Sequence, residues 1–143
     1  MKLRRWPLAI LVLSALAASS VPLMAAAPAE QAAEQAIIVY YFHGDKRCKT
    51  CRTIEAYAEE ALQSRFSKEL ESGLLKWKVV NFDQPENKHF LDDFGLYSSS
   101  VVIVESDGEK IVRHEILPEV WSLVREKQSF FAYLNTAVRK YLE

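Results

Sequence analysis

Residues 43–52 read His-Gly-Asp-Lys-Arg-Cys-Lys-Thr-Cys-Arg and contain both cysteines of the chain, Cys48 and Cys51. They follow an apolar run, residues 37–42, that predicts a buried strand, and they lead into a helical pattern that begins near Cys48. A helix N-terminus carries partial positive charge and free N–H groups, which favour a thiolate over a thiol. Four cationic side chains act in the same direction: Lys46, Arg47, Lys49 and Arg52. The stretch therefore predicts a redox dithiol.

The composition of the chain is that of one globular domain. Half of the 143 residues are hydrophobic and 16 are aromatic, which is enough to build a core. Lys and Arg number 18 against 19 Asp and Glu, and the two signs are interleaved along the chain. This balance argues against a nucleic-acid partner.

The start of the chain has the pattern of an export signal. Residues 1–29 combine a basic beginning, an apolar run over residues 6–21 and a small-residue end, which are the three parts of a signal peptide. Cleavage is expected after Ala26 or Ala29, and the domain is expected to cover residues 30–143. We expect the mature protein in a bacterial periplasm. An uncleaved membrane anchor is the alternative, and it is the only membrane contact that we expect.

Hydrophobic periodicity predicts the order strand, helix, strand, helix, strand, strand, helix. The predicted strands cover residues 37–42, 75–82, 101–104 and 110–116, and the helices follow the cysteines and cover residues 86–94 and 119–142. We expect a mixed four-stranded sheet flanked by helices. The first three strands should pair in parallel, and the last two should form an antiparallel hairpin. The tryptophans Trp77 and Trp121 are expected to pack in the core or on the hairpin.

This order, with Cys-x-x-Cys after the first strand, resembles the thioredoxin fold over about residues 37–142. The segments Phe94-Gly95-Leu96, Val101-Val102-Ile103 and Asp107-Gly108-Glu109 resemble the thioredoxin passage into its hairpin. In this alignment Ser100 takes the place of the cis-proline beside the active site. The resemblance implies an α/β, thioredoxin-like domain of order βαβαββα, with Ser100 close to the dithiol.

Several residues depart from the thioredoxin pattern. Arg47 replaces the tryptophan before the first cysteine, and Lys49-Thr50 replaces Gly-Pro. Because Ser100 is not a proline, the peptide bond before it need not be cis. The first strand lacks the buried aspartate of thioredoxins, a part that Glu55, one helical turn after Cys51, could take.

Together these features resemble a smaller group of exported Cys-x-x-Cys proteins. Some members of that group carry the label nitroreductase subunit for nitrophenyl compounds. The chain has only four glycines and no Gly-rich phosphate loop, so we expect neither flavin nor nicotinamide, and no other cofactor.

The predicted activity is thiol–disulfide exchange. Cys48, nearer the helix start, would attack a partner protein's disulfide, and Cys51 would release the mixed disulfide. A membrane thiol-electron transporter is a candidate electron donor. Two alternatives remain: a structural disulfide, and a soft-metal or metalloid site for Cu(I) or arsenic formed by Cys48, Cys51 and His43.

Overall fold

The computed structural model describes residues 35–143. The predicted signal peptide, residues 1–29, lies outside the described residues. Within residues 35–143, no helix is both long enough and apolar enough to cross a bilayer.

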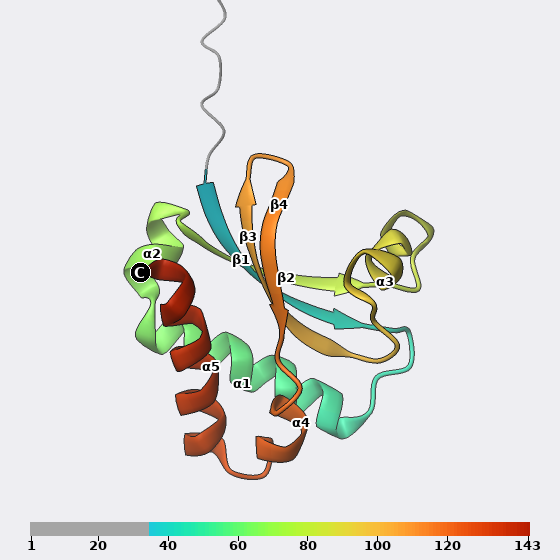
Figure 1. Ribbon diagram of the computed structural model, residues 1–143. Coiled ribbons are helices and arrows are strands. Elements are labelled where there is room, and N and C mark those ends of the chain that lie inside the picture. The colour runs from blue at the N-terminus through green and yellow to red at the C-terminus, as the bar shows by residue number, and fades with distance from the viewer. Residues whose placement is uncertain (1–34) are drawn as a thin grey trace, which may run out of the picture. The chain divides into compact units, whose positions relative to one another are not determined.

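The four strands form one mixed sheet in the order β2-β1-β3-β4 (Figure 1). Their bounds are β1 Gln35–His43, β2 Leu75–Asn81, β3 Ser100–Asp107 and β4 Lys110–Ile116. β1 pairs in parallel with β2 and antiparallel with β3, and β3 pairs antiparallel with β4. Seven consecutive residues of β1 are buried, because this strand lies inside the sheet and carries apolar side chains on both faces.

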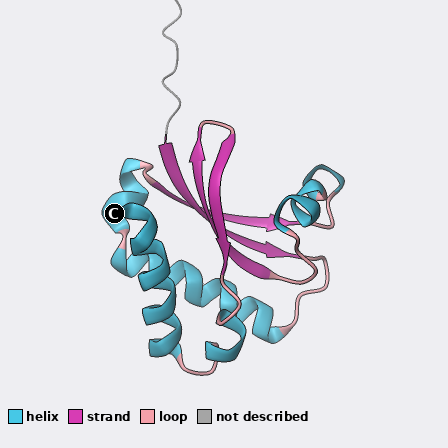
Figure 2. Cartoon of the chain, in the orientation of Figure 1, coloured by secondary structure: helices cyan, strands magenta, loops and turns pink. Residues whose placement is uncertain are grey.

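Helices cover the sheet unequally on its two sides (Figure 2). The chain forms α1 Lys49–Arg65, α2 Ser67–Ser72, a 3-10 turn η1 Pro85–Asn87, α3 His89–Phe94, α4 Val120–Leu123 and α5 Lys127–Leu142. One core combines the face of β1 that carries Val39 and Tyr41 with residues of α1 and α5. The other face, with Tyr40 and Phe42, packs against the short α3. The predicted architecture, a mixed four-stranded sheet flanked by helices, is confirmed.

The direction of β3 differs from the prediction. We expected the first three strands to run in parallel, but β3 is antiparallel to β1, with Phe42 opposite Ser100 and Gln35 opposite Asp107. A six-residue helix such as α3 rises about 9 Å, whereas a seven-residue strand such as β2 extends about 23 Å. The connection through η1 and α3 is therefore too short to return the chain along the length of β2. As a result β3 begins at the end of the sheet where β1 stops.

The helical C-terminal region also differs in detail. The pattern over residues 119–142 predicts one helix, but the chain forms α4 and α5 as separate helices. Glu126 has φ −119° and ψ 82°, which lie outside the helical region and interrupt the run. This break lets α4 lie beside the first turn of α1, while α5 packs along it (Figure 1).

Candidate functional site

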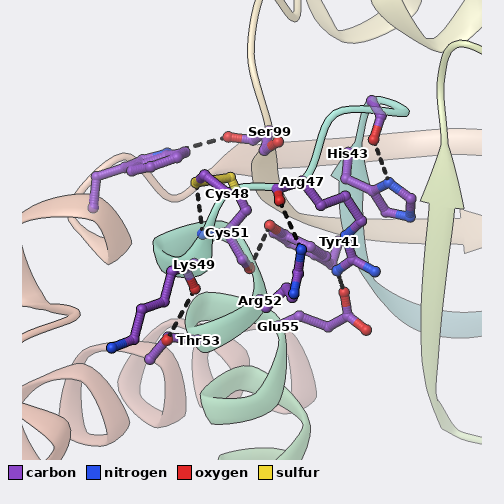
Figure 3. Close-up of a disulfide and its surroundings, with 12 residues drawn as sticks. Tyr41, His43, Arg47, Cys48, Lys49, Cys51, Arg52, Thr53, Glu55 and Ser99 are labelled. Atoms are coloured by element: carbon purple, nitrogen blue, oxygen red, sulfur yellow. Dashed lines mark hydrogen bonds and ion pairs between the residues drawn. A yellow bond between two sulfur atoms is a disulfide. The ribbon is translucent and has the colours of Figure 1, made fainter.

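Cys48 and Cys51 form a disulfide at the N-terminus of α1, with 5.1 Å between their Cα atoms (Figure 3). Cys48 is the N-cap residue, and its sulfur accepts a hydrogen bond from the Cys51 backbone N–H at 3.0 Å. Cys48 is exposed, whereas Cys51 is 6% exposed. An exposed cysteine at a helix start and a buried one a turn later are what attack by Cys48 and resolution by Cys51 would require.

Tyr41 of β1 links this central strand to α1, the helix that carries the disulfide. Its hydroxyl donates a buried hydrogen bond to the Cys51 carbonyl oxygen at 2.7 Å. The side chain is fully buried, and this burial raises the pKa of the Tyr41 hydroxyl, an effect opposed by the Arg47 charge and a hydrogen bond with the Ser99 side chain. The sequence pattern places Tyr41 only in an apolar strand, because its hydrogen-bond partner is a backbone atom ten residues away.

Replacing Tyr41 by phenylalanine is expected to lower the free energy of unfolding by about 1 kcal/mol at pH 7, because one buried hydrogen bond is lost. The measurement is denaturant unfolding of the oxidised protein. The matched control is Tyr97→Phe, since the Tyr97 side chain is 96% exposed and should leave stability unchanged. Equal losses in the two variants would contradict the role given to the Tyr41 hydroxyl.

The same tyrosine predicts a pH dependence. Because the pKa of Tyr41 is raised in the folded protein, the unfolded chain releases this proton at lower pH, and ionisation favours unfolding. The stabilisation is complete below about pH 10, the ordinary tyrosine pKa, and is lost as pH rises through the folded value. Tyr41→Phe should therefore lose less stability than the wild type between about pH 9 and pH 11. If the wild type and Tyr41→Phe lose the same stability over this pH range, ionisation of Tyr41 is not the cause.

The loop between β1 and the disulfide is fixed to the end of β2. The Asp45 backbone N–H donates to Asp83 Oδ2 at 2.8 Å, and Asn81 Nδ2 donates to Asp45 Oδ1 at 2.7 Å. Gly44 lies so close to this contact that an added Cβ would be 2.8 Å from Asp83 Oδ2 and 3.2 Å from a Phe82 ring carbon. Polar residues at the ends of β1 and β2 thus hydrogen-bond the two following loops to each other, and this contact positions Cys48.

Gly44→Ala is expected to destabilise the protein by about 1–3 kcal/mol, because the new methyl group must displace the Asp83 carboxylate. A double-mutant cycle with Asp83→Ala isolates this clash. In the Asp83→Ala background the added methyl should cost less, since its nearest contact is gone and only the Phe82 ring carbon at 3.2 Å remains. Additive losses in the cycle, measured by denaturant unfolding, would show that the contact between Gly44 and Asp83 is not the cause.

Arg47 forms an ion pair with Glu55, and its guanidinium lies 6.0 Å from the centre of the Tyr41 ring (Figure 3). Both charged side chains are about one quarter exposed. Arg52 donates to the Arg47 carbonyl oxygen at 3.1 Å and so closes the turn around the first cysteine. Because Glu55 neutralises Arg47, this cation favours a Cys48 thiolate less than the sequence pattern suggests. The exposed Lys46 and Lys49 still favour the thiolate form of Cys48.

Ser99, directly before β3, lies next to the disulfide. Ser100 stands opposite Phe42 near the end of β1, and Figure 3 shows Ser99 beside Cys48. All peptide bonds within residues 35–143 are trans, including the one before Ser100. Trp121 Nε1 donates to the Ser99 carbonyl oxygen at 3.1 Å and joins α4 to this loop.

Two other sequence-derived expectations concern Trp121 and His43. Trp121 is 39% exposed and lines a hollow with Lys49 and Thr50, so of its two expected places, the core or the hairpin, the core is wrong. His43 Nδ1 lies 2.9 Å from the Gly44 carbonyl oxygen, and its ring points away from the disulfide (Figure 3). Within residues 35–143, no group of three or more His, Cys, Asp or Glu side chains is arranged to hold a metal ion. The three ligands of the alternative soft-metal site are therefore not gathered here.

Comparisons with known proteins give thioredoxins as structural neighbours. Thioredoxin O2 from Arabidopsis thaliana in its oxidized state has a TM-score of 0.42 and 14% identity, over 67% of this chain and 76% of that one. Trypanosoma brucei brucei thioredoxin has a TM-score of 0.40 and 20% identity, over 71% and 80%. Fasciola hepatica thioredoxin has a TM-score of 0.39 and 17% identity, over 68% and 81%. No protein-family model and no curated protein sequence matches the chain.

Proposed function

We propose that this chain is an exported thioredoxin-like thiol–disulfide oxidoreductase that exchanges its Cys48–Cys51 pair with partner proteins. One observation carries the proposal: Cys48, an exposed residue, caps the first turn of α1, and Cys51 is buried. This arrangement gives one sulfur that a partner can reach and one that a partner cannot. A purely structural disulfide gains nothing from such a difference in exposure.

The reaction in the reducing direction has two steps. The Cys48 thiolate attacks one sulfur of a partner disulfide, forms a mixed disulfide and releases the other partner sulfur as a thiolate. The Cys51 thiol, after losing its proton to solvent, attacks the Cys48 sulfur and releases the second partner thiol. Two electrons pass from the dithiol to the partner, and the Cys48–Cys51 disulfide remains. The reverse sequence oxidises a partner dithiol.

The proposed compartment is the periplasm, and it rests on the signal-peptide pattern of residues 1–29. Thiols there do not stay reduced without a dedicated donor. For a reducing role we propose a membrane thiol-electron transporter as that donor. Its thiols would reach the Cys48–Cys51 disulfide from the exposed Cys48 side.

The test is equilibration of the full chain with glutathione buffers, combined with an insulin-type disulfide reduction assay. The exposed Lys46 and Lys49 stabilise a Cys48 thiolate and hence the reduced form. We therefore expect a reduction potential above about −270 mV, the thioredoxin value, toward the −120 mV of a strong oxidant. A disulfide that stays oxidised below about −300 mV, together with no exchange activity, would contradict the proposal and favour a structural bond.

A further inference from the structure

A hollow of about 380 Å³ opens beside the disulfide. Its lining comes from the first turns of α1 and from the α4 region: Lys49, Thr50, Thr53, Trp121, Val124 and Arg125. Two of these residues, Lys49 and Thr50, stand between the cysteines. A polypeptide bound through its own cysteine to Cys48 would therefore pass over or along this hollow.

The charges around the hollow have one sign. Lys49 and Arg125 line it, and no acidic side chain does. Within residues 35–143 neither cation has an acidic partner, whereas Arg47 is paired with Glu55. Residues 46–52 contain four cations and no acid, although residues 35–143 as a whole carry 15 Lys and Arg against 17 Asp and Glu. The positive charge is concentrated at the disulfide of a domain that is otherwise slightly acidic.

Trp121 supplies a fixed apolar surface between these cations. Its ring is held by the hydrogen bond from Nε1 to the Ser99 carbonyl oxygen, yet 39% of the residue is exposed. Val124 lies beside it in the hollow. A second, smaller hollow of about 110 Å³ on the Ser98–Ser100 side is also lined by Trp121. A chain crossing the disulfide would meet an aromatic side chain with cations close by.

We propose that the partner of the Cys48–Cys51 site is an acidic polypeptide segment, with Asp or Glu within a few residues of its reacting cysteine and an apolar side chain that packs on Trp121. This inference rests on the proposed function and specifies its substrate class. Lys49 and Arg125 select the segment by charge, which acts mainly on the association rate. Trp121 and Val124 contribute the apolar contact that limits dissociation.

The test compares two symmetric disulfide dimers of nine-residue peptides, identical except for Glu or Lys on both sides of a single cysteine. The full chain in its reduced form converts each dimer into two thiol peptides and becomes oxidised. We expect a rate constant about tenfold or more higher for the acidic dimer at low ionic strength, falling toward equality near 1 M salt. Equal rates at low salt, or faster reaction with the basic dimer, would overturn the proposal.

Two variants with the same change in charge localise the effect. Arg125→Glu should reduce the ratio of acidic to basic rates about fivefold or more, because it inverts one wall of the hollow. Lys68 lies on α2, beyond the far end of the 17-residue α1. The variant Lys68→Glu should therefore change the ratio less than about twofold. Equal shifts in the two variants would mean that net charge, and not the hollow, sets the preference.

Two further measurements separate this inference from the proposed function. Hydroxyethyl disulfide is neutral, so Lys68→Glu should reduce it at the wild-type rate; absence of this reaction in the wild type would refute the proposed function itself. Isothermal titration with the acidic peptide, carrying serine in place of cysteine, measures binding to the hollow without disulfide exchange. Weaker binding to Arg125→Glu than to Lys68→Glu supports the proposal, and no binding to the wild type overturns it.

Discussion

Cys48→Ser is expected to abolish disulfide reduction, with a loss of at least about three orders of magnitude in rate, because no nucleophilic sulfur remains at the exposed position. The measurement is reduction of an insulin-type disulfide and of hydroxyethyl disulfide by the fully reduced full chain. Cys51 stays in place in this variant, but it is buried within the first turn of α1. A Cys48→Ser protein that works at the full rate would remove Cys48 as the attacking residue.

Cys51→Ser is the matched control, since it changes the same atom in the other cysteine. This variant keeps the attacking thiolate but lacks the resolving one, so we expect it to accumulate a mixed disulfide with its substrate. Mass spectrometry under non-reducing conditions would detect that adduct at Cys48. Trapping by Cys48→Ser and not by Cys51→Ser would reverse the two roles.

Phe130→Ala is expected to lower the free energy of unfolding by about 3–5 kcal/mol, because a fully buried ring leaves a cavity between α5 and α1. Phe130 packs edge-to-face against Tyr57 of α1, with ring centres 5.7 Å apart. Such a loss is a large part of the stability of a domain of this size. Denaturant unfolding of the oxidised protein measures it.

The neighbouring Phe131→Ala provides the matched control. Phe131 also contacts Tyr57 edge-to-face, at 6.1 Å, but it is only partly buried. We expect it to lose about half as much stability, since less apolar surface leaves water on folding. Equal losses in the two variants would show that burial of Phe130 is not what holds α5 on α1.

The features that the sequence predicted correctly are those set by neighbours along the chain. The buried β1, the helix that starts at Cys48 and the short helix before Gly95 all follow from residue type and spacing within ten to twenty positions. The start of a helix near Cys48 follows from the same local pattern, and so does the order of the four strands. These suffice for the fold class and for the location of the disulfide.

The features that the sequence did not predict depend on contacts between distant segments. The direction of β3 depends on how far α3 carries the chain, which composition does not reveal. Trp121 is expected in the core or on the hairpin, but it is 39% exposed and donates a hydrogen bond to Ser99, 22 positions away. The pairing of Arg47 with Glu55 needs the turn that Arg52 closes. Each of these lies within or next to the candidate site.

The N-cap position of the Cys48 sulfur has a consequence for the energy of electron transfer. In the disulfide this sulfur already accepts the Cys51 N–H. A thiolate at the same place would be a stronger acceptor for the same donor, so we expect reduction to change the charge of the sulfur but not its hydrogen-bond partner. We therefore expect little reorganisation of the protein in each redox cycle. Oxidised and reduced forms should have nearly superimposable amide spectra beyond the first turns of α1.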